Sequence, residues 1–156
     1  RKVTGENIYD KIISHGVEYL CGAPTVLSFI INTDTPNVKK LNGRVKLMTA
    51  AAPPPAKILE QIEKCGFDVT HVYGLTEVYG PAVICKWKSE WNRLGDSEKS
   101  NLKSRQGVPY LVQEDLKVVN SETRKEVNPN GNELGEVLLR GNITMKGYLR
   151  SEEHHV

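Results

Sequence analysis

Apolar residues recur at helical spacing along the first half of the chain. The segment Ile8–Ile13 places its apolar side chains on one face of a helix, and Gly16 supplies an end signal. Pro24 can occupy the first helical position of a second segment, whose apolar residues are spaced in the same way. A third segment, residues 58–65, repeats the pattern. The apolar spacing therefore predicts helices within residues 8–15, 24–31 and 58–65.

Runs of strand-like sequence lie between these helices. Val17–Cys21 is a short apolar run that suits a buried strand, Val45–Thr49 alternates apolar with polar residues, and Phe67–Val72 forms the next run. The order of strands and helices implies right-handed crossovers. The first half therefore predicts an α/β fold, with a mainly parallel sheet and flanking helices.

The second half of the chain has a different pattern. Residues 90–105 are polar with scattered apolar positions, which predicts helical turns and a loop. Leu116–Val119 and Glu136–Arg140 are strand-like and lie on either side of a turn signal at Asn128–Gly131, so they favour antiparallel pairing. We expect a parallel α/β part over residues 1–107 and a smaller β-rich subdomain over residues 108–156.

Composition excludes several classes of function. Lys and Arg total 21 and Asp and Glu total 19, for a formal net charge of +2, which argues against a nucleic-acid partner. The longest apolar run, Val26–Ile31, is broken by a serine and is too short for a transmembrane segment. The three cysteines Cys21, Cys65 and Cys85 match no metal or redox spacing. We expect buried, reduced thiols and hence an intracellular protein.

The segment with the richest chemistry follows the third predicted strand. Within five residues it holds the ring of Tyr73, the small Gly74, the hydroxyl of Thr76 and the carboxylate of Glu77. Ligands of open α/β sheets bind beyond the carboxyl ends of the strands, so this loop suits a ligand site. A carboxylate is also a ligand that Mg²⁺ favours. The alternative is a plain loop in which Thr76 caps a helix and Glu77 is solvated.

Tyr73–Glu77 resembles the Tyr-Gly-x-Thr-Glu signature of the acyl-activating, AMP-binding (adenylate-forming) enzymes. Three further blocks resemble that family in the same order, and a tract containing Trp87 and Trp91 resembles its plant carboxylate–CoA ligases. The resemblance implies part of the large N-terminal domain of such an enzyme. The three blocks are Gly22–Leu27, Met48–Pro55 and Gly135–Gly141 with Met145–Tyr148.

The resemblance implies an acid–thiol ligase that uses ATP, Mg²⁺ and coenzyme A on a small carboxylic acid. Tyr73 would stack on adenine, His71 would lie at the adenine edge, and Thr76 would contact the α-phosphate or the acyl carboxylate as a catalytic residue. Glu77, the second catalytic residue, would hold the metal. The implied nucleotide-binding residues are His71, Val72, Tyr73, Gly74, Leu75, Thr76, Ala51, Ala52 and Pro53, and the implied acyl pocket contains Ala23, Pro24, Ala50 and Ala51.

The chain also departs from the family pattern. Ala50 and Ala51 stand where the related Thr-Gly-Gly-Ala-Pro block has glycines, so an alanine would be strained if either backbone needs a positive φ. The sequence contains no Ser/Thr/Gly-rich phosphate loop, and the family's C-terminal lysine is absent. We therefore expect an internal fragment that is inactive by itself in forming acyl-CoA.

Other interpretations stay open. The same adenylation chemistry serves peptide-synthetase adenylation domains and luciferase-like enzymes, and a truncated product could be a non-catalytic module that binds a nucleotide or a partner chain. A nicotinamide dehydrogenase is disfavoured, because no Gly-x-Gly-x-x-Gly follows a strand. Lys99, Lys103 and Arg105 form a basic patch that we expect to be solvated, and Trp87 and Trp91 are expected to belong to the core rather than to a ligand platform.

Overall fold

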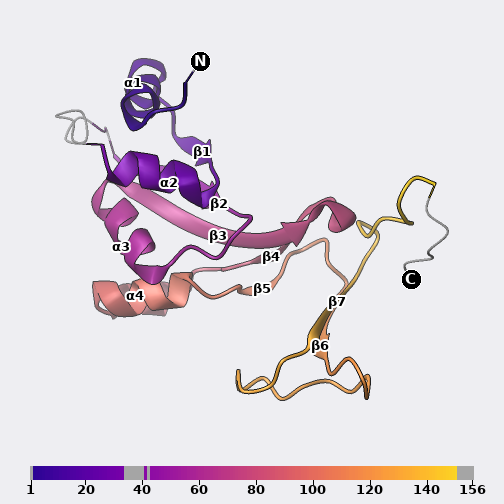
Figure 1. The fold of residues 1–156 in the computed structure, drawn as a ribbon. Helices are drawn as coiled ribbons and strands as arrows, with labels where there is room; N and C mark the ends of the chain where they lie inside the picture. Colours follow the sequence, from indigo (N-terminus) through magenta and orange to yellow (C-terminus); the bar gives the residue numbers. More distant parts are fainter. Residues whose placement is uncertain (1, 34–40, 42, 151–156) are drawn as a thin grey trace. The chain divides into compact units, whose positions relative to one another are not determined.

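A computed structural model describes residues 2–33, 41 and 43–150 of the chain (Figure 1). Its helices and strands alternate in the first half, and strands predominate in the second. The helices are α1 (Gly5–His15), α2 (Pro24–Ile31), α3 (Ala56–Lys64) and α4 (Asp96–Lys103). The strands are β1 (Tyr19–Cys21), β2 (Val45–Thr49), β3 (Phe67–Leu75), β4 (Gly80–Ile84), β5 (Val108–Pro109), β6 (Asp115–Val119) and β7 (Glu136–Arg140). Short 3₁₀ turns cover Thr76–Val78 and Ser89–Arg93.

The chain forms two compact units. The first unit comprises Arg1–Tyr73 with Ile84–Val108, and the second comprises Gly74–Val83 with Pro109–Val156. Five strands form one sheet in the order β1-β2-β3-β4-β5, and β6 and β7 form a separate pair. The predicted α/β class, with a mainly parallel sheet and a small antiparallel one, is confirmed.

The parallel part of the sheet has a simple register. Leu20 of β1 lies opposite Leu47 of β2, which lies opposite Val69 of β3, and both pairs of strands run parallel. The first strand is shorter than the predicted Val17–Cys21. The backbone N–H of Val17 donates to the carbonyl of Ile12 at 3.0 Å and so belongs to the end of α1 rather than to the sheet.

One face of this sheet carries the core of the first unit. Val45 and Leu47 of β2 and Phe67 and Val69 of β3 alternate with exposed residues, as expected for strands with one buried face. The helices contribute apolar side chains of amphipathic spacing, and the ring of Tyr9 meets that of Phe67 edge to face at 6.1 Å. The helical members of this core are Tyr9, Ile12, Leu27, Ile30, Leu59 and Ile62.

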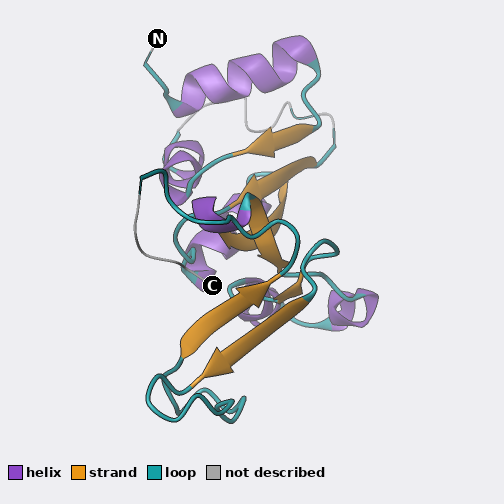
Figure 2. Ribbon diagram, turned by 90° about the vertical axis from the view of Figure 1, so that its right-hand side faces the viewer, coloured by secondary structure: helices purple, strands orange, loops and turns teal. Residues whose placement is uncertain are grey.

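The second unit contains the antiparallel pair that the sequence predicts. Leu116 lies opposite Leu139 and Val118 opposite Val137. Figure 2 draws the strands as orange arrows. Ion pairs at the surface accompany the pairing, including Arg124 with Glu136 at 2.8 Å. Exposed pairs of this kind add little stability.

Two broader expectations can be compared with the described residues. No helix among them is long and apolar enough to cross a bilayer. The expectation that all three cysteines are buried is wrong for Cys21, which is exposed at the end of the open-faced strand β1, whereas Cys85 is buried and Cys65 is partly buried. All three are free thiols.

Candidate functional site

Three of the segments predicted to bind ligand lie at one edge of the first unit. Cys21 and Met48 are register partners at the ends of β1 and β2, and Thr49 is the partner of His71 on β3. The N–H of Gly22 continues the ladder by donating to the carbonyl of Met48 at 3.0 Å. The segments that follow these positions therefore emerge at the same carboxyl edge. They contain Ala23 and Pro24, then Ala50, Ala51, Ala52 and Pro53, then Val72 and Tyr73.

The residues at this edge differ in their exposure. Ala51, Ala52 and Pro53 are exposed, and Ala23 is exposed directly before α2, which begins at Pro24. The side chain of Val72 is buried, so only its backbone could contact a ligand. Tyr73 is half-buried and is therefore not sealed in the core. Its ring keeps an accessible part of its surface, as stacking on a flat heterocycle requires.

Ala51 adopts a strained backbone conformation. Its φ is +84°, in the left-handed region that L-residues rarely occupy. Of the two alanines that stand in place of the family's glycines, only Ala51 has a positive φ among the described residues. The expected strain is therefore confirmed at Ala51 and is not observed at Ala50.

Ala51→Gly is expected to stabilise the protein by about 0.5–1 kcal/mol. Relief of left-handed strain contributes about 1–2 kcal/mol, and the greater freedom of glycine in the unfolded chain offsets part of it. Ala52→Gly is the matched control, because Ala52 has no positive φ and its substitution should cost about 0.4–1 kcal/mol. Urea unfolding measures both. Equal destabilisation by the two substitutions would contradict the strain at Ala51.

His71 is held by two later segments of the same unit. It is 2% exposed, and its Nδ1 lies 3.3 Å from the carbonyl oxygen of Arg105. Its own carbonyl accepts the N–H of Cys85 at 2.8 Å. Burial lowers the pKa of the imidazole, so the ring is neutral at pH 7. His71 thus offers a neutral, oriented imidazole at the end of the parallel part of β3.

The other segment predicted to bind ligand forms a tight turn in the second unit. The predicted loop after Val72 is shorter than expected, because β3 continues through Leu75 and only Thr76–Val78 turn. Tyr79 is left-handed at φ +59° and donates its N–H to the carbonyl of Thr76 at 3.1 Å. Thr76 and Leu75 are exposed, and Glu77 is half-buried. The alternative in which Thr76 caps a helix is wrong, since no side-chain cap is made at this turn.

Gly74 permits the close approach on which this turn depends. A Cβ added at Gly74 would lie 1.8 Å from the carbonyl oxygen of Gly80. A glycine, which has no Cβ, lets a neighbouring backbone approach closely. The backbone that approaches is the chain's own, on the neighbouring strand β4.

Glu77 is joined to a distant block of the sequence. The hydroxyl of Tyr148 donates to Oε1 of Glu77, and the N–H of Met145 donates to the Glu77 carbonyl at 2.8 Å. The Tyr148 hydrogen bond holds the pKa of the Glu77 carboxyl below its ordinary value and raises the pKa of Tyr148. Sequence reasoning missed Tyr148 as a partner of Glu77, because the two residues are 71 positions apart.

A single carboxylate limits the kind of metal site that is possible. Among residues 2–33, 41 and 43–150, no three His, Cys, Asp or Glu side chains gather as a ligand set. Mg²⁺ is usually bound by one or two carboxylates together with substrate phosphates and waters. The hydroxyl of Tyr148 donates to Oε1, and an ionised carboxylate has further lone pairs that could bind such an ion. The chemistry of this donor fits a cation carried by a nucleotide.

Tyr148→Phe is expected to weaken Mg²⁺-dependent ATP binding by about tenfold, as removal of an outer partner of a metal ligand usually does. The ring stays and only the donor to Glu77 is lost. Tyr79→Phe is the matched control, since Tyr79 lies in the same unit and is 90% exposed. Titration calorimetry with and without Mg²⁺ measures the effect. Equal losses in the two variants would contradict a role for the Tyr148 hydroxyl.

Comparison with known proteins gives a consistent result. The sequence model of the family described as AMP-binding enzyme matches residues 3–149. The 2-methylpropanoate–CoA ligase of Humulus lupulus is 48% identical over 98% of this chain and 27% of its own length. The peroxisomal trans-cinnamate:CoA ligase of Petunia hybrida is 40% identical over 98% of this chain and 27% of its own length.

Solved structures support the same fold. A long-chain-fatty-acid–CoA ligase of Archaeoglobus fulgidus superposes with a TM-score of 0.71 at 20% identity, over 96% of this chain and 30% of that one. The chain spans about a quarter of the length of the curated relatives named above. Since the family model covers nearly all of its residues, the chain belongs to the AMP-binding enzyme family.

Proposed function

We propose that this chain supplies the nucleotide- and acyl-binding part of an ATP-dependent carboxylate–CoA ligase. The observation that carries the proposal is the match to the AMP-binding enzyme family over residues 3–149. The printed names of the relatives are those of CoA ligases, which favours this chemistry over the peptide-synthetase and luciferase-like alternatives.

The proposed reaction has two steps. In the first step a carboxylate oxygen bonds to the α-phosphorus of ATP while the bond to pyrophosphate breaks, which gives an acyl adenylate. In the second step the sulfur of coenzyme A attacks the acyl carbon, AMP leaves, and the thiol proton passes to solvent. Two anions must meet in the first step, so fixed donors and charge compensation at the phosphates are needed.

The residues at the carboxyl edge suit the binding of the adenine ring and the acyl group. Tyr73 would stack on the adenine ring, with His71 at its edge, and the backbone of Ala51 and Ala52 would line the nucleotide and acyl pocket. Support comes from the register, which sets these segments on neighbouring parallel strands. The methyl group of the left-handed Ala51 would narrow the acyl pocket where the family has glycine.

The turn in the second unit suits the binding of the ATP phosphates and their cation. Thr76 would donate its exposed hydroxyl to the α-phosphate or to the acyl carboxylate, and Glu77 would hold the Mg²⁺ of Mg·ATP. The bound cation supplies charge neutralisation at the phosphates. The hydrogen bond from Tyr148 fixes the Glu77 carboxylate before ligand arrives. This preorganisation lowers the cost of ordering the carboxylate during binding.

A chimera tests the proposal without depending on the length of this chain. Residues 3–149 replace the matched segment of the Humulus lupulus ligase. The chimera is supplied with Mg·ATP, coenzyme A and 2-methylpropanoate, acetate, benzoate or trans-cinnamate. We expect equal amounts of pyrophosphate and acyl-CoA from at least one acid, and loss of both in the Glu77→Gln chimera. A folded chimera that releases no acid-dependent pyrophosphate, beside an active parent ligase, would contradict the proposal.

A further inference from the structure

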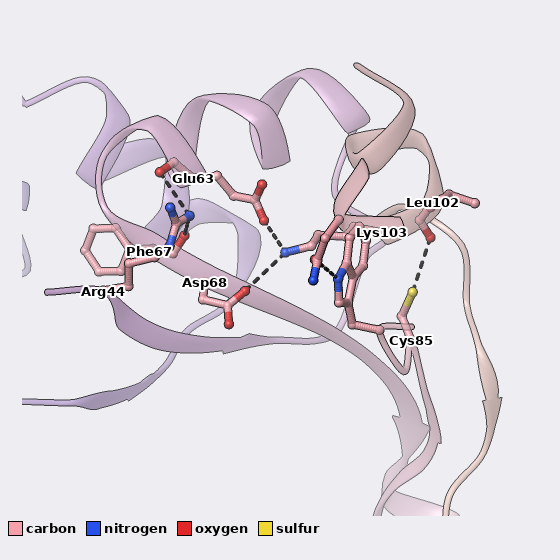
Figure 3. A network of polar contacts seen from close by, with 9 residues as sticks. Arg44, Glu63, Phe67, Asp68, Cys85, Leu102 and Lys103 are labelled. Atoms are coloured by element: carbon pink, nitrogen blue, oxygen red, sulfur yellow. Dashed lines mark hydrogen bonds and ion pairs between the residues drawn. The ribbon is translucent and has the colours of Figure 1, made fainter. Parts of the chain in front are cut away.

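The buried side chain of Lys103 carries its ammonium group into a polar cluster of the first unit. Lys103 is 8% exposed, and its Nζ donates to Glu63 and, at 3.2 Å, to Asp68 (Figure 3). The same Nζ lies 4.9 Å from the centre of the Trp87 ring. A buried cation is costly unless it is paired. The expectation that Lys103 belongs to a solvated basic patch is therefore wrong, and its pairing joins the end of α4 to α3 and β3.

The cluster continues along the chain beyond α4. The guanidinium of Arg105 lies 5.1 Å from the centre of the Trp91 ring, and its Nε donates to the carbonyl of Leu102 at 3.2 Å. Trp87 and Trp91 pack edge to face with their ring centres 5.3 Å apart. Both indoles are half-buried, and each contacts one of the two cations. The Trp87 ring lies against Lys103, and the Trp91 ring lies against Arg105.

Cys85 links the end of α4 to β3. Its thiol donates to the carbonyl of Leu102 at 3.3 Å, and its backbone N–H donates to the carbonyl of His71 at 2.8 Å. The end of α4 and the backbone of His71 therefore share a partner. The carbonyl of Arg105, in the segment fixed by this cluster, reaches Nδ1 of His71.

The contact with Arg105 determines which nitrogen of His71 can carry the proton. A backbone carbonyl oxygen only accepts, so the neutral imidazole must place its hydrogen on Nδ1. Nε2 is then an acceptor with no partner among the residues that the structure describes. It is not one of their fully buried unpartnered polar atoms, so the small exposed part of the ring includes this nitrogen. Loss of the Arg105 carbonyl from this position would free the ring to exchange its proton between the two nitrogens.

We propose that Lys103 is a positioning residue that fixes His71 with its proton on Nδ1, by anchoring the segment that presents the Arg105 carbonyl. On the ligand side, this inference rests on the proposed function. An Nε2 acceptor at the base edge suits a purine that offers an amino group there and disfavours one that offers a carbonyl oxygen. Lys103 would therefore set the preference between amino- and oxo-purine nucleotides without contacting either.

Nitrogen-15 NMR of the histidine rings tests the positioning directly, in the chain without ligand. We expect His71 to be in the Nδ1–H form in the unmodified chain and to shift toward the Nε2–H form in Lys103→Met. Lys103→Arg keeps the positive charge and should keep the Nδ1–H form. Lys99→Met is the matched control, because Lys99 lies on the same helix and lines the same hollow as Lys103. It should leave the His71 signal unchanged.

Either of two results from the unmodified chain and Lys103→Met would overturn the inference. One is an Nε2–H form of His71 in the unmodified chain, and the other is an unchanged Nδ1–H form in a folded Lys103→Met chain. If the amide spectrum shows that Lys103→Met does not fold, Glu63→Gln takes its place, since it removes the charge that pairs with Lys103 and leaves the Trp87 ring in place. It should produce the same shift of the proton, and an unchanged Nδ1–H form in that variant would overturn the inference.

A nucleotide comparison separates this inference from the proposed function. The ratio of ATP affinity to inosine triphosphate affinity is measured for the unmodified chain, Lys103→Met and Lys99→Met. We expect the ratio to exceed one and to fall only in Lys103→Met. A tautomer shift with an unchanged ratio would contradict the specificity role. A tautomer shift in a chain that binds neither nucleotide would contradict the proposed function while supporting the positioning role.

Discussion

Gly74→Ala is expected to open the hairpin that carries Thr76 and Glu77. The new Cβ would lie 1.8 Å from the Gly80 carbonyl oxygen and 3.0 Å from Cα of Pro81, and backbone atoms cannot rotate away as a side chain can. Overpacking of this kind costs about 3 kcal/mol. The ordinary gain from replacing glycine, about 0.4–1 kcal/mol, is smaller, so steric repulsion decides the sign.

Hydrogen exchange over Tyr73–Ile84 measures this effect where it occurs. Protection of the β4 amides should fall strongly in Gly74→Ala. Gly95→Ala is the control, because Gly95 has a φ of −69° and its added Cβ would meet only the Glu98 carboxylate at 3.5 Å. That change should cost about 1 kcal/mol or less, through the weaker helix cap. Unaltered protection of β4 in Gly74→Ala would contradict the close packing of the hairpin.

Glu77→Gln should separate the charge of this side chain from its shape. Glutamine keeps an acceptor for the Tyr148 hydroxyl, so the turn should persist while the negative charge is lost. Affinity for Mg·ATP should fall by at least roughly tenfold, since even outer partners of metal ligands contribute that much. Affinity for AMP without metal should stay within about twofold. Titration calorimetry distinguishes these outcomes, and equal loss for both ligands would indicate a folding defect.

The same carboxylate predicts the pH dependence of metal-assisted binding. The hydrogen bond from Tyr148 lowers the pKa of Glu77, so the carboxylate stays ionised at a lower pH than a free glutamate would. Binding of Mg·ATP should therefore be retained as the pH falls through the usual glutamate range and be lost only below it. In Tyr148→Phe the loss should begin at a higher pH. Identical pH profiles for the two proteins would contradict the assigned hydrogen bond.

Local sequence patterns were sufficient for the fold of the first unit. Helical periodicity and strand alternation are short-range signals, and they predicted β2 over the observed residues Val45–Thr49. The placement of the segments around Ala51 and Val72 at one edge follows from parallel strand order alone. Gly66 directly follows the third predicted helix, at the position where a left-handed glycine commonly ends a helix, and its φ is +93°.

Contacts between different elements could not be predicted from such patterns. The extension of β3 through Leu75 depends on Gly74 meeting Gly80 across a hairpin, and an isolated run of sequence does not reveal that pairing. The burial of Lys103 depends on Glu63 and Asp68, which are 40 and 35 positions away. A lysine in a polar segment is ordinarily solvated, so only its tertiary partners distinguish this one.

The central claim is that the segment Tyr73–Glu77 binds an acyl adenylate. Hydrogen exchange of the protein with and without 2-methylpropanoyl sulfamoyl adenosine, a stable mimic of an acyl adenylate, tests it most directly. The account predicts slower exchange at Tyr73–Glu77 and at Ala50–Ala52, with no change in the strands β6 and β7. The contrary result is that the mimic binds at saturation and slows exchange elsewhere, while Tyr73–Glu77 exchanges as fast as in the protein without ligand. That result would contradict the claim.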